Sequence, residues 1–433
     1  MKNKILNKIN NRTAIIGVIG LGYVGLPLLI RFSEEGFKTI GFDINKKIIT
    51  NLNKKQSYIK HINEEKIKSL IKSGFIGTTT FKKIVNVDVI LICVPTPLGQ
   101  HNEPDLRYIK STLNSIKPYL INGQIIILES TTYPGTTEEE IIPLIESLGF
   151  SIGKDFFVGY SPEREDPGNK QFDTRSIPKV VSGITNNCLF VIKALYDSIV
   201  NETVPVSSTR VAEMTKILEN IHRAVNIGLI NELKMITHKM NIDIYEVIRA
   251  ASTKPFGFSP FYPGPGLGGH CIPIDPFYLS WKAKEVDMNT RFIELAGEIN
   301  TFMPHYVVEK IISSLNDVGK PLAKSRVLIL GIAYKKNIDD LRESPSLKIL
   351  EILMGKKAIV EYNDPYFESI PKTRNYNFKL NSIELNKDTL KSFDLVLLAT
   401  DHDIFDYELI INNSSLIVDT RGKFKNNKNV IRA

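Results

Sequence analysis

The chain has 433 residues, 42% of them hydrophobic and 24% charged, which is enough for two or three domains with their own cores. Its net charge is +8, but the lysines are scattered and no basic run alternates with aromatic residues, so we expect phosphate-bearing small molecules rather than nucleic acid as partners. Three cysteines at long spacings, Cys93, Cys188 and Cys271, argue against disulfides and a zinc site and favour a reducing compartment, with no metal expected.

The beginning of the chain imitates a signal peptide or a membrane anchor. Basic residues 1–12 precede an apolar stretch over residues 14–30. That stretch contains four glycines and a proline and is followed by Arg31 instead of a cleavage site, a poor pattern for a spanning helix. We therefore predict a soluble, cytoplasmic chain with no membrane partner.

Residues 1–200 predict a first domain in which short apolar runs alternate with helical patterns. The runs are β-branched and bounded by turns, which is typical of buried strands. The expected strands are 14–19, 39–42, 87–94 and 124–129, and the expected helices are 26–35, 62–73, 106–119 and 137–148. Such alternation predicts a parallel sheet with helices on both faces.

A glycine motif at the end of the first strand predicts a dinucleotide site. Gly20, Gly22 and Gly25 form GxGxxG between strand and helix, where they permit a tight turn, close approach of a pyrophosphate and packing of helix on strand. The helix N-terminus favours phosphate. Asp43 ends the next strand, where a carboxylate accepts hydrogen bonds from ribose hydroxyls and repels a 2′-phosphate. We expect NAD as the cofactor rather than NADP.

Other residues of the same edge complete the predicted cofactor site. Two strands are followed by turns at the carboxyl edge of the sheet, where a nucleotide lies in such folds. The added positions are Tyr23 and Val24 in the glycine motif, Pro95 and Thr96 after one strand, and Thr131 after another. The turns after these strands could face the cofactor or the substrate, or be ordinary turns.

Residues 208–250 predict one long amphipathic helix with few breakers until Asn241. Its apolar stripe comprises Val211, Met214, Leu218, Ile221, Val225, Leu229, Leu233 and Ile236. Lys216 and Asn220 are four residues apart, hence on one face, and we place them close to this stripe. A helix this long either bridges domains or forms a dimer interface, so residues 201–310 are predicted as a central helical dimerisation domain. On the helix alone, Lys216 could simply reach solvent.

The segment 263–275 holds a thiol in a rigid loop. It contains four glycines and three prolines in thirteen residues, with Cys271 next to His270 and Asp275 four residues further on. A thiolate attacks carbonyl carbon when its pKa is lowered, so Cys271 is a candidate nucleophile; the alternative is a small buried hydrophobe. Beside NAD, a thiol suggests addition to an aldehyde, oxidation to a thioester and hydrolysis.

A second alternating block begins near residue 326 and predicts a smaller α/β domain over residues 311–433. The expected strands are 326–330, 358–362, 395–399 and 416–419, with a helix over 346–353. This block has Gly331 but lacks GxGxxG, so we expect no second NAD site. The predicted fold class is α/β, with two Rossmann-like parallel-sheet domains joined by a long central helix.

The chain resembles the nucleotide-sugar 6-dehydrogenases of the UDP-glucose dehydrogenase superfamily. The matching blocks run in family order from about residue 14 to 422. They are Gly20–Gly25, Glu129–Thr131, Tyr160–Arg164, Glu213–Lys216 with Asn220, Gly268–Cys271 with Asp275, Tyr334–Lys335, and Arg342–Ser344. The resemblance implies oxidation of a sugar C6 alcohol to a carboxylate with two NAD, and a C-terminal domain that binds UDP.

The resemblance also implies roles for individual residues. Cys271 resembles the family nucleophile, and Lys216 and Asn220 resemble the groups that hold the oxyanion. Asp275 resembles the carboxylate that helps activate water or steers the lysine, while Glu163 and Thr131 resemble residues that order a catalytic water. The substrate-binding positions implied are Glu163, Arg164, Lys216, Asn220, Phe261, Gly268, Lys335, Arg342 and Arg421.

The loop type narrows the substrate. Residues 253–258 and 261–278 resemble the branch that acts on UDP-N-acetylhexosamines, and they depart from the UDP-glucose branch around the cysteine. The prediction is a UDP-N-acetylglucosamine 6-dehydrogenase, cytoplasmic and homodimeric, that supplies capsule or O-antigen polysaccharide. The alternatives are UDP-N-acetylgalactosamine, UDP-N-acetylmannosamine or UDP-glucose as the substrate, and, in another class, a non-catalytic NAD-sensing protein.

Overall fold

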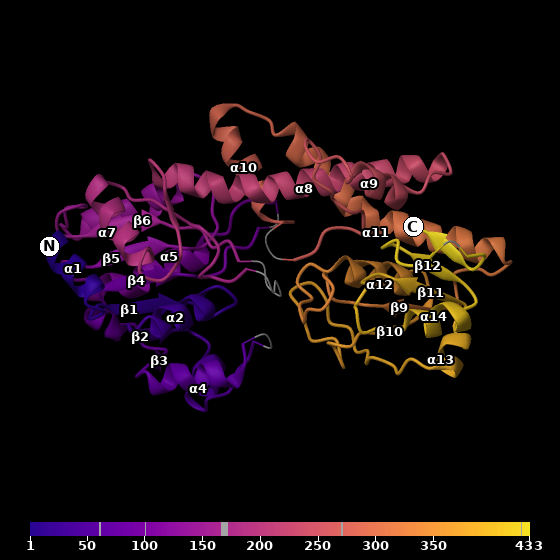
Figure 1. Ribbon diagram of the computed structural model, residues 1–433, viewed down its shortest axis with the longest axis horizontal. Helices are drawn as coiled ribbons and strands as arrows, with labels where there is room; N and C mark the ends of the chain where they lie inside the picture. The colour runs from indigo at the N-terminus through magenta and orange to yellow at the C-terminus, as the bar shows by residue number, and fades with distance from the viewer. Residues whose placement is uncertain (60–61, 100, 166–171, 270–271, 426) are drawn as a thin grey trace. The chain divides into compact units, whose positions relative to one another are not determined.

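The computed structural model describes the whole chain except residues 60–61, 100, 166–171, 270–271 and 426 (Figure 1). It divides into two compact units, and each is described by itself. The first comprises Met1–Glu219 with Phe277–Met288, and the second Asn220–Pro276 with Asn289–Ala433. No helix within the described ranges is long and apolar enough to cross a membrane.

The first unit is built on a six-stranded, fully parallel sheet in the order β3-β2-β1-β4-β5-β6. This order is that of the dinucleotide-binding folds, with a switch point between β1 and β4. The strands are β1 (Ile15–Ile19), β2 (Lys38–Phe42), β3 (Ile76–Thr78), β4 (Val89–Ile92), β5 (Ile125–Leu128) and β6 (Phe157–Tyr160). The four predicted strands are confirmed within two residues; β3 and β6 were not predicted.

Helices cover this sheet, as the alternating pattern predicted. On one face the core joins Ile16 and Val18 of β1 to apolar residues of α2 and α7. The helices before residue 200 are α1 (Lys2–Asn10), α2 (Gly25–Glu34), α3 (Lys46–Asn53), α4 (Glu64–Lys72), α5 (Arg107–Ile116), α6 (Ile142–Ser147) and α7 (Asn186–Tyr196). A separate two-stranded parallel sheet pairs β7 (Lys179–Val181) with β8 (Thr203–Pro205).

The basic residues at the beginning of the chain form a helix of the first unit. Ile5 and Ile9 of α1 are buried and belong to the same core as β1. The lysines lie on the rest of the helix, and Lys8 donates to Asp88 at 2.5 Å. The segment that imitates a signal peptide is therefore folded into the domain.

The predicted long helix is confirmed as α8 (Thr209–Lys239), but it ends earlier than expected, and residues Ile244–Ala251 form a separate helix, α9. The place of Lys216 and Asn220 relative to the apolar stripe of α8 also differs from our expectation. Val211, Leu218, Leu229, Leu233 and Ile236 are exposed in the single chain. The buried side of α8 is partly polar, with Glu213, Lys216, Asn220, Asn231 and Lys234. Lys216 and Asn220 thus do not adjoin the stripe. The polar side chains face the protein and the stripe is left outside.

The second unit has a five-stranded parallel sheet in the order β10-β9-β11-β12-β13. Its strands are β9 (Arg326–Leu330), β10 (Ile359–Asn363), β11 (Leu395–Leu398), β12 (Ile417–Asp419) and β13 (Val430–Arg432). The four predicted strands are confirmed, and β13 adds the edge. The switch point of this order lies between β9 and β11.

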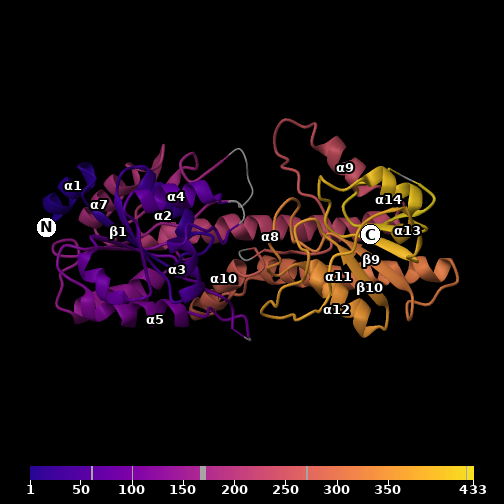
Figure 2. The same cartoon turned by 90° about the horizontal axis from the view of Figure 1, so that it is seen from below.

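Helices cover both faces of the second sheet. Val327 and Ile329 pack with α11 (Arg291–Asp317) and α12 (Pro345–Gly355), whereas Leu328 and Leu330 pack with α13 (Lys387–Lys391) and α14 (Tyr407–Asn413). Figure 2 shows α12 on the side of the sheet away from α14. The remaining helices are α9 (Ile244–Ala251) and α10 (Asp275–Ala283), which begins in this unit. Consecutive residues of β9 therefore serve opposite faces.

Candidate active site

The glycine turn after β1 has the geometry that the motif predicted. Gly20 has φ +90°, and a Cβ there would lie 2.5 Å from the carbonyl oxygen of Cys93. A Cβ on Gly25 would lie 1.9 Å from the oxygen of Gly20, so helix and turn can approach only without one. A Cβ on Gly22 would meet nothing within 4 Å. Gly22 therefore borders open space at the N-terminus of α2, where a pyrophosphate would lie.

Asp43 is joined to this turn. One carboxylate oxygen accepts the backbone N–H of Leu21 at 2.9 Å, and the other accepts that of Asn45 at 2.8 Å. The side chain is only partly buried, so lone pairs remain for ribose hydroxyls. Tyr23 and Val24 are also partly exposed beside the turn. These residues fit an adenine dinucleotide.

Thr96 and Thr131 come together at the same edge of the sheet. The hydroxyl of Thr96 donates to the carbonyl oxygen of Thr131 at 2.7 Å, joining the segments that follow β4 and β5. The Tyr278 hydroxyl donates to the carbonyl oxygen of Thr96, and Pro95 is exposed. The predicted positions after β4 and β5 therefore lie together at the carboxyl edge of the sheet.

Glu163 is held by a dense set of donors. One of its oxygens accepts the backbone N–H groups of Arg164 and Glu165, each at 2.7 Å, and the other accepts the Lys179 ammonium at 3.1 Å. Burial alone would raise the pKa of Glu163, but Lys179, the Glu165 N–H and Lys216 together hold it below its ordinary value. Glu163 is therefore a stable carboxylate, suited to orienting a polar group by its charge.

A buried ion pair supports this carboxylate from behind. Lys179 also contacts Glu129 at 2.8 Å, and the Tyr196 hydroxyl donates to Glu129. Burial raises the pKa of Glu129 to about 7, against the opposing charge of Lys179. Burial and the Glu129 charge raise the pKa of the Cys93 thiol, which disfavours its thiolate form.

Sequence reasoning missed Lys179, although a signal existed. It begins the short strand β7, where Val180 and Val181 are also buried, and a lone cation in an apolar strand requires a partner. Its partners lie 50 and 16 residues away. The partner therefore could not be found by local spacing.

Arg164 and Lys216 occupy neighbouring places in the first unit. Arg164 forms an ion pair with Glu219 of α8 at 2.7 Å and donates to the carbonyl oxygen of Pro178 at 2.8 Å. Lys216 lies one turn before Asn220 on the buried side of α8, and its charge acts on Glu163. The structure thus brings together three of the predicted residues, Glu163, Arg164 and Lys216.

Asn220 and Asp275 meet in the second unit. The Asn220 side-chain amide donates to Asp275 at 2.6 Å, and both side chains are buried. Asp275 is the first residue of α10, where an N-terminal helix dipole favours a carboxylate. Cys271, four residues earlier, lies outside the described residues, as does His270.

The loop before Cys271 lies against residues of the second unit. A Cβ on Gly268 would lie 2.4 Å from Cβ of Tyr334, and one on Gly264 would lie 2.8 Å from the Arg421 guanidinium. Phe261 packs against the ring of His222 at 5.7 Å between centroids. The loop is thus fitted closely to its surroundings.

The three predicted substrate-binding cations of the C-terminal domain differ in their surroundings. Arg421 donates to the carbonyl oxygen of Ala399 at 2.7 Å, near the switch point. Arg342 forms a forked pair with Asp340, the shortest contact being 2.6 Å. Lys335 is partly exposed in the segment that follows β9. Arg421 and Lys335 belong to segments that follow strands, whereas Arg342 lies further along the segment after β9.

The chain matches the UDP-glucose/GDP-mannose dehydrogenase family in three consecutive stretches. The NAD binding domain of the family matches residues 14–200, the central domain residues 210–302, and the UDP binding domain residues 328–426. Together these stretches cover most of the chain. NAD is therefore the cofactor, in agreement with the glycine turn and Asp43.

Named relatives match nearly the whole chain. Protein CapL of Staphylococcus aureus is 38% identical over 414 residues, 94% of this chain and 95% of that protein. The UDP-N-acetyl-D-glucosamine 6-dehydrogenase of Salmonella typhi is 35% identical over 392 residues, 90% of each chain. The solved UDP-D-ManNAc dehydrogenase of Pyrococcus horikoshii is 30% identical with a TM-score of 0.86, over 96% of this chain and 98% of that one. The chain belongs to the UDP-glucose/GDP-mannose dehydrogenase family of NAD-dependent enzymes, in the UDP-N-acetylhexosamine branch that its motifs predicted.

Proposed function

We propose that this protein oxidises the C6 alcohol of UDP-N-acetylglucosamine to the carboxylate, giving UDP-N-acetylglucosaminuronate for capsule or O-antigen synthesis. The alcohol, two NAD⁺ and one water give the carboxylate, two NADH and three protons. NAD accepts a hydride in each oxidation. The protein must therefore hold an aldehyde between the two oxidations and admit water only after the second.

The buried hydrogen bond between Asn220 and Asp275 carries this proposal. It places an amide and a carboxylate at the end of the cysteine loop, and Lys216 is one turn away on the same side of α8. We assign Lys216 and Asn220 to the oxyanion and Cys271 to the thiolate that adds to the aldehyde. Loss of hydride from that adduct leaves a thioester on Cys271.

Glu163 and Thr131 are the residues that we assign to the water. Because the pKa of Glu163 is held low, it orients the water as an anion and is a weak base. The proton of the attacking water then goes to another group, and we assign it to Asp275. In this proposal Glu163 orients the water and Asp275 accepts its proton.

The cofactor and the nucleotide have separate binding regions in this proposal. Residues 1–200 bind NAD, 201–310 form the central domain and 311–433 bind UDP. The NAD contacts are Gly20, Gly22, Tyr23, Val24, Gly25, Asp43, Pro95, Thr96 and Thr131. The substrate contacts are Glu163, Arg164, Lys216, Asn220, Phe261, Gly268, Lys335, Arg342 and Arg421.

UDP-N-acetylmannosamine is the second candidate substrate, because a solved relative with nearly full coverage is named for it. The test is to mix the protein with NAD and, separately, UDP-N-acetylglucosamine, its galacto and manno epimers, and UDP-glucose. NADH is counted per sugar consumed. Two NADH with the gluco sugar support the proposal. If two NADH form only with another sugar, that sugar is the substrate. If only one NADH forms per sugar, the second oxidation and the thioester hydrolysis do not take place.

Replacing the thiol separates an enzyme from a non-catalytic NAD-sensing protein. Cys271→Ser should abolish formation of the acid and keep NAD binding, because the glycine turn and Asp43 belong to the first unit. NADH production and NAD affinity are measured on the same samples. Unchanged turnover in this variant would contradict the thioester, and no NADH from wild type with any sugar would favour the sensing protein.

We further propose a homodimer formed through the exposed side of α8. Five apolar side chains of this helix face solvent in the single chain, and a second copy would cover them. Leu233→Glu should give monomers in sedimentation at micromolar concentration, with Lys239→Glu, an exposed position of the same helix, as the control. A monomeric wild type would contradict the dimer.

A further inference from the structure

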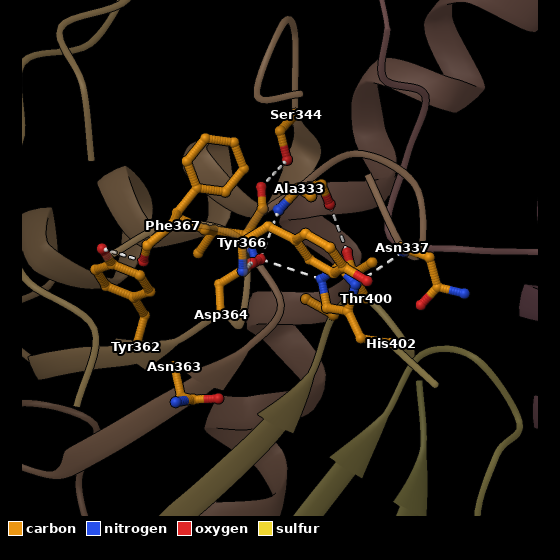
Figure 3. Close-up of polar contacts among 12 residues, drawn as sticks. Ala333, Asn337, Ser344, Tyr362, Asn363, Asp364, Tyr366, Phe367, Thr400 and His402 are labelled. Carbon is orange, nitrogen blue, oxygen red and sulfur yellow. Dashed lines mark hydrogen bonds and ion pairs between the residues drawn. The ribbon is translucent and has the colours of Figure 1, made fainter. Parts of the chain in front are cut away.

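The segment Gly331–Ser344, between β9 and α12, is fixed by a buried polar cluster of the second unit. Asp364 follows β10 and accepts the backbone N–H groups of Ile332 at 2.7 Å and Ala333 at 3.1 Å. Figure 3 shows His402 between Asp364 and Asn337. His402 Nε2 lies 3.1 Å from Asp364 Oδ2, and both side chains are fully buried.

His402 ties two parts of the segment together. Its Nδ1 accepts the backbone N–H of Asn337 at 2.9 Å, so this nitrogen carries no proton and the ring proton on Nε2 points to Asp364. The beginning of the segment is held by Asp364 and its middle by His402. The segment is therefore clamped on both sides of Tyr334.

Two further hydroxyls hold the same stretch (Figure 3). Ser344 donates to the carbonyl oxygen of Ile332 at 2.7 Å, and Thr400 donates to that of Ala333 at 2.6 Å. Both hydroxyl residues are buried. Both residues before Tyr334 are thus hydrogen-bonded at N–H and C=O, which leaves the backbone that leads to Tyr334 little freedom.

Tyr334 lies against the loop that precedes Cys271. A Cβ on Gly268 would come within 2.4 Å of Tyr334 Cβ, and one on Gly269 within 3.0 Å of the tyrosine ring. The N–H of Gly269 donates to the carbonyl oxygen of Arg342, at the far end of the segment, at 2.9 Å. The two glycines are therefore required by this contact, and they are followed in sequence by His270 and Cys271.

We propose that Tyr334 is a positioning residue for catalysis: its ring supports the backbone at Gly269, its Cβ lies against Gly268, and the Asp364–His402 pair holds Tyr334 in place. The inference rests on the proposed role of Cys271. A displacement of about 1 Å at a reacting group can lower a rate on the order of a hundredfold. Loss of the support should therefore slow the chemical step more than it weakens binding.

The test compares Tyr334→Ala with Tyr334→Phe in the full-length protein. Tyr334 is only partly buried, so its replacement spares the core. We expect Tyr334→Ala to lower kcat about tenfold to a hundredfold with KM for NAD and UDP-sugar changed less than about threefold. Tyr334→Phe keeps the ring and should restore most of kcat. Lys336→Ala, at an exposed position of the same segment, is the matched control and should equal wild type.

A second readout needs no turnover. The rate at which iodoacetamide alkylates Cys271 without nucleotide is followed by peptide mass spectrometry, which separates it from Cys93 and Cys188. Tyr334→Ala should change this rate at least about threefold, and Lys336→Ala should not. A KM increase for UDP-sugar with kcat and alkylation unchanged would make Tyr334 a nucleotide contact and overturn the inference.

His402 gives an independent arm. His402→Phe keeps a ring between Tyr366 and Phe405 but removes both hydrogen bonds, and it should reproduce the kcat loss of Tyr334→Ala; His402→Gln, which can donate and accept, should recover part of it. Normal kcat in a folded His402→Phe protein would refute the anchoring. An active Cys271→Ser protein would contradict the proposed function. A Tyr334→Ala protein with normal activity, together with an inactive Cys271→Ser protein, would contradict only the role of Tyr334.

Discussion

Lys234→Met should stabilise the protein, by an amount that depends on pH. Lys234 lies on the buried side of α8 with 3% of its surface exposed, and its ammonium has no hydrogen-bond partner within the described part of the chain. Burial, and then the charge of Arg421, lower its pKa from 10.5 to about 7. Folding therefore works against the protonated form of this side chain.

The size of the effect follows from the shift. Lowering the pKa of Lys234 from 10.5 to about 7 costs the folded state roughly 5 kcal/mol at pH values below the folded pKa, and about 4 kcal/mol at pH 7. The unfolded chain binds more protons than the folded one between about pH 7 and 10.5, so stability rises with pH across this window. By pH 9.5 the cost has fallen to about 1 kcal/mol.

The assay is urea unfolding of wild type and Lys234→Met at pH 7.0 and 9.5, followed by circular dichroism through the transition of the second unit. Methionine keeps the length of the side chain without its charge. The stability advantage of the variant should shrink by about 3 kcal/mol between the two pH values. Lys239→Met, exposed on the same helix, should show no such change. An advantage that does not vary with pH would refute the reasoning.

Two further predictions concern the first unit. Lys179→Met leaves Glu129 and Glu163 without their shared cation and should lower the free energy of unfolding by about 3–5 kcal/mol. Lys179→Arg, which keeps a cation, should lose less. The midpoints of denaturant unfolding measure both differences. Gly22→Ala should change the free energy of unfolding by no more than about 0.5 kcal/mol. It should weaken NAD binding at least about tenfold in calorimetry, because the new Cβ would enter the space beside the turn. Gly25→Ala should prevent folding instead, because its Cβ would collide with the carbonyl oxygen of Gly20.

The strands and the cofactor turn could be predicted because their determinants are local. A buried strand appears as a short β-branched run, and Gly20 and Gly25 are required by atoms of the turn and its flanking strand and helix. The edge strand β13 is short and only partly buried, so its sequence carries little pattern. The helix α11 was not predicted, because Pro304 interrupts the helical pattern of its sequence, although the helix continues through this residue.

The orientation of α8 could not be read from its own sequence. The spacing of apolar residues locates the stripe, and we expected Lys216 and Asn220 to lie close to it rather than opposite it. In the structure Asn231 is buried between Asn300 and the N–H of Gly264, because these two segments supply the hydrogen bonds that it needs. Only the tertiary partners reveal that the polar side is the buried one.

The two sheets use a carboxylate at the same place in opposite ways. Asp43 follows β2 and bonds the turn after β1 through Leu21, as Asp364 follows β10 and bonds the segment after β9. Asp43 is partly exposed and keeps lone pairs for a ligand. Asp364 is buried, and its oxygens accept three backbone N–H groups and the His402 ring. A ribose hydroxyl would have to displace one of these donors, so the second sheet uses this carboxylate to hold its own segment in place.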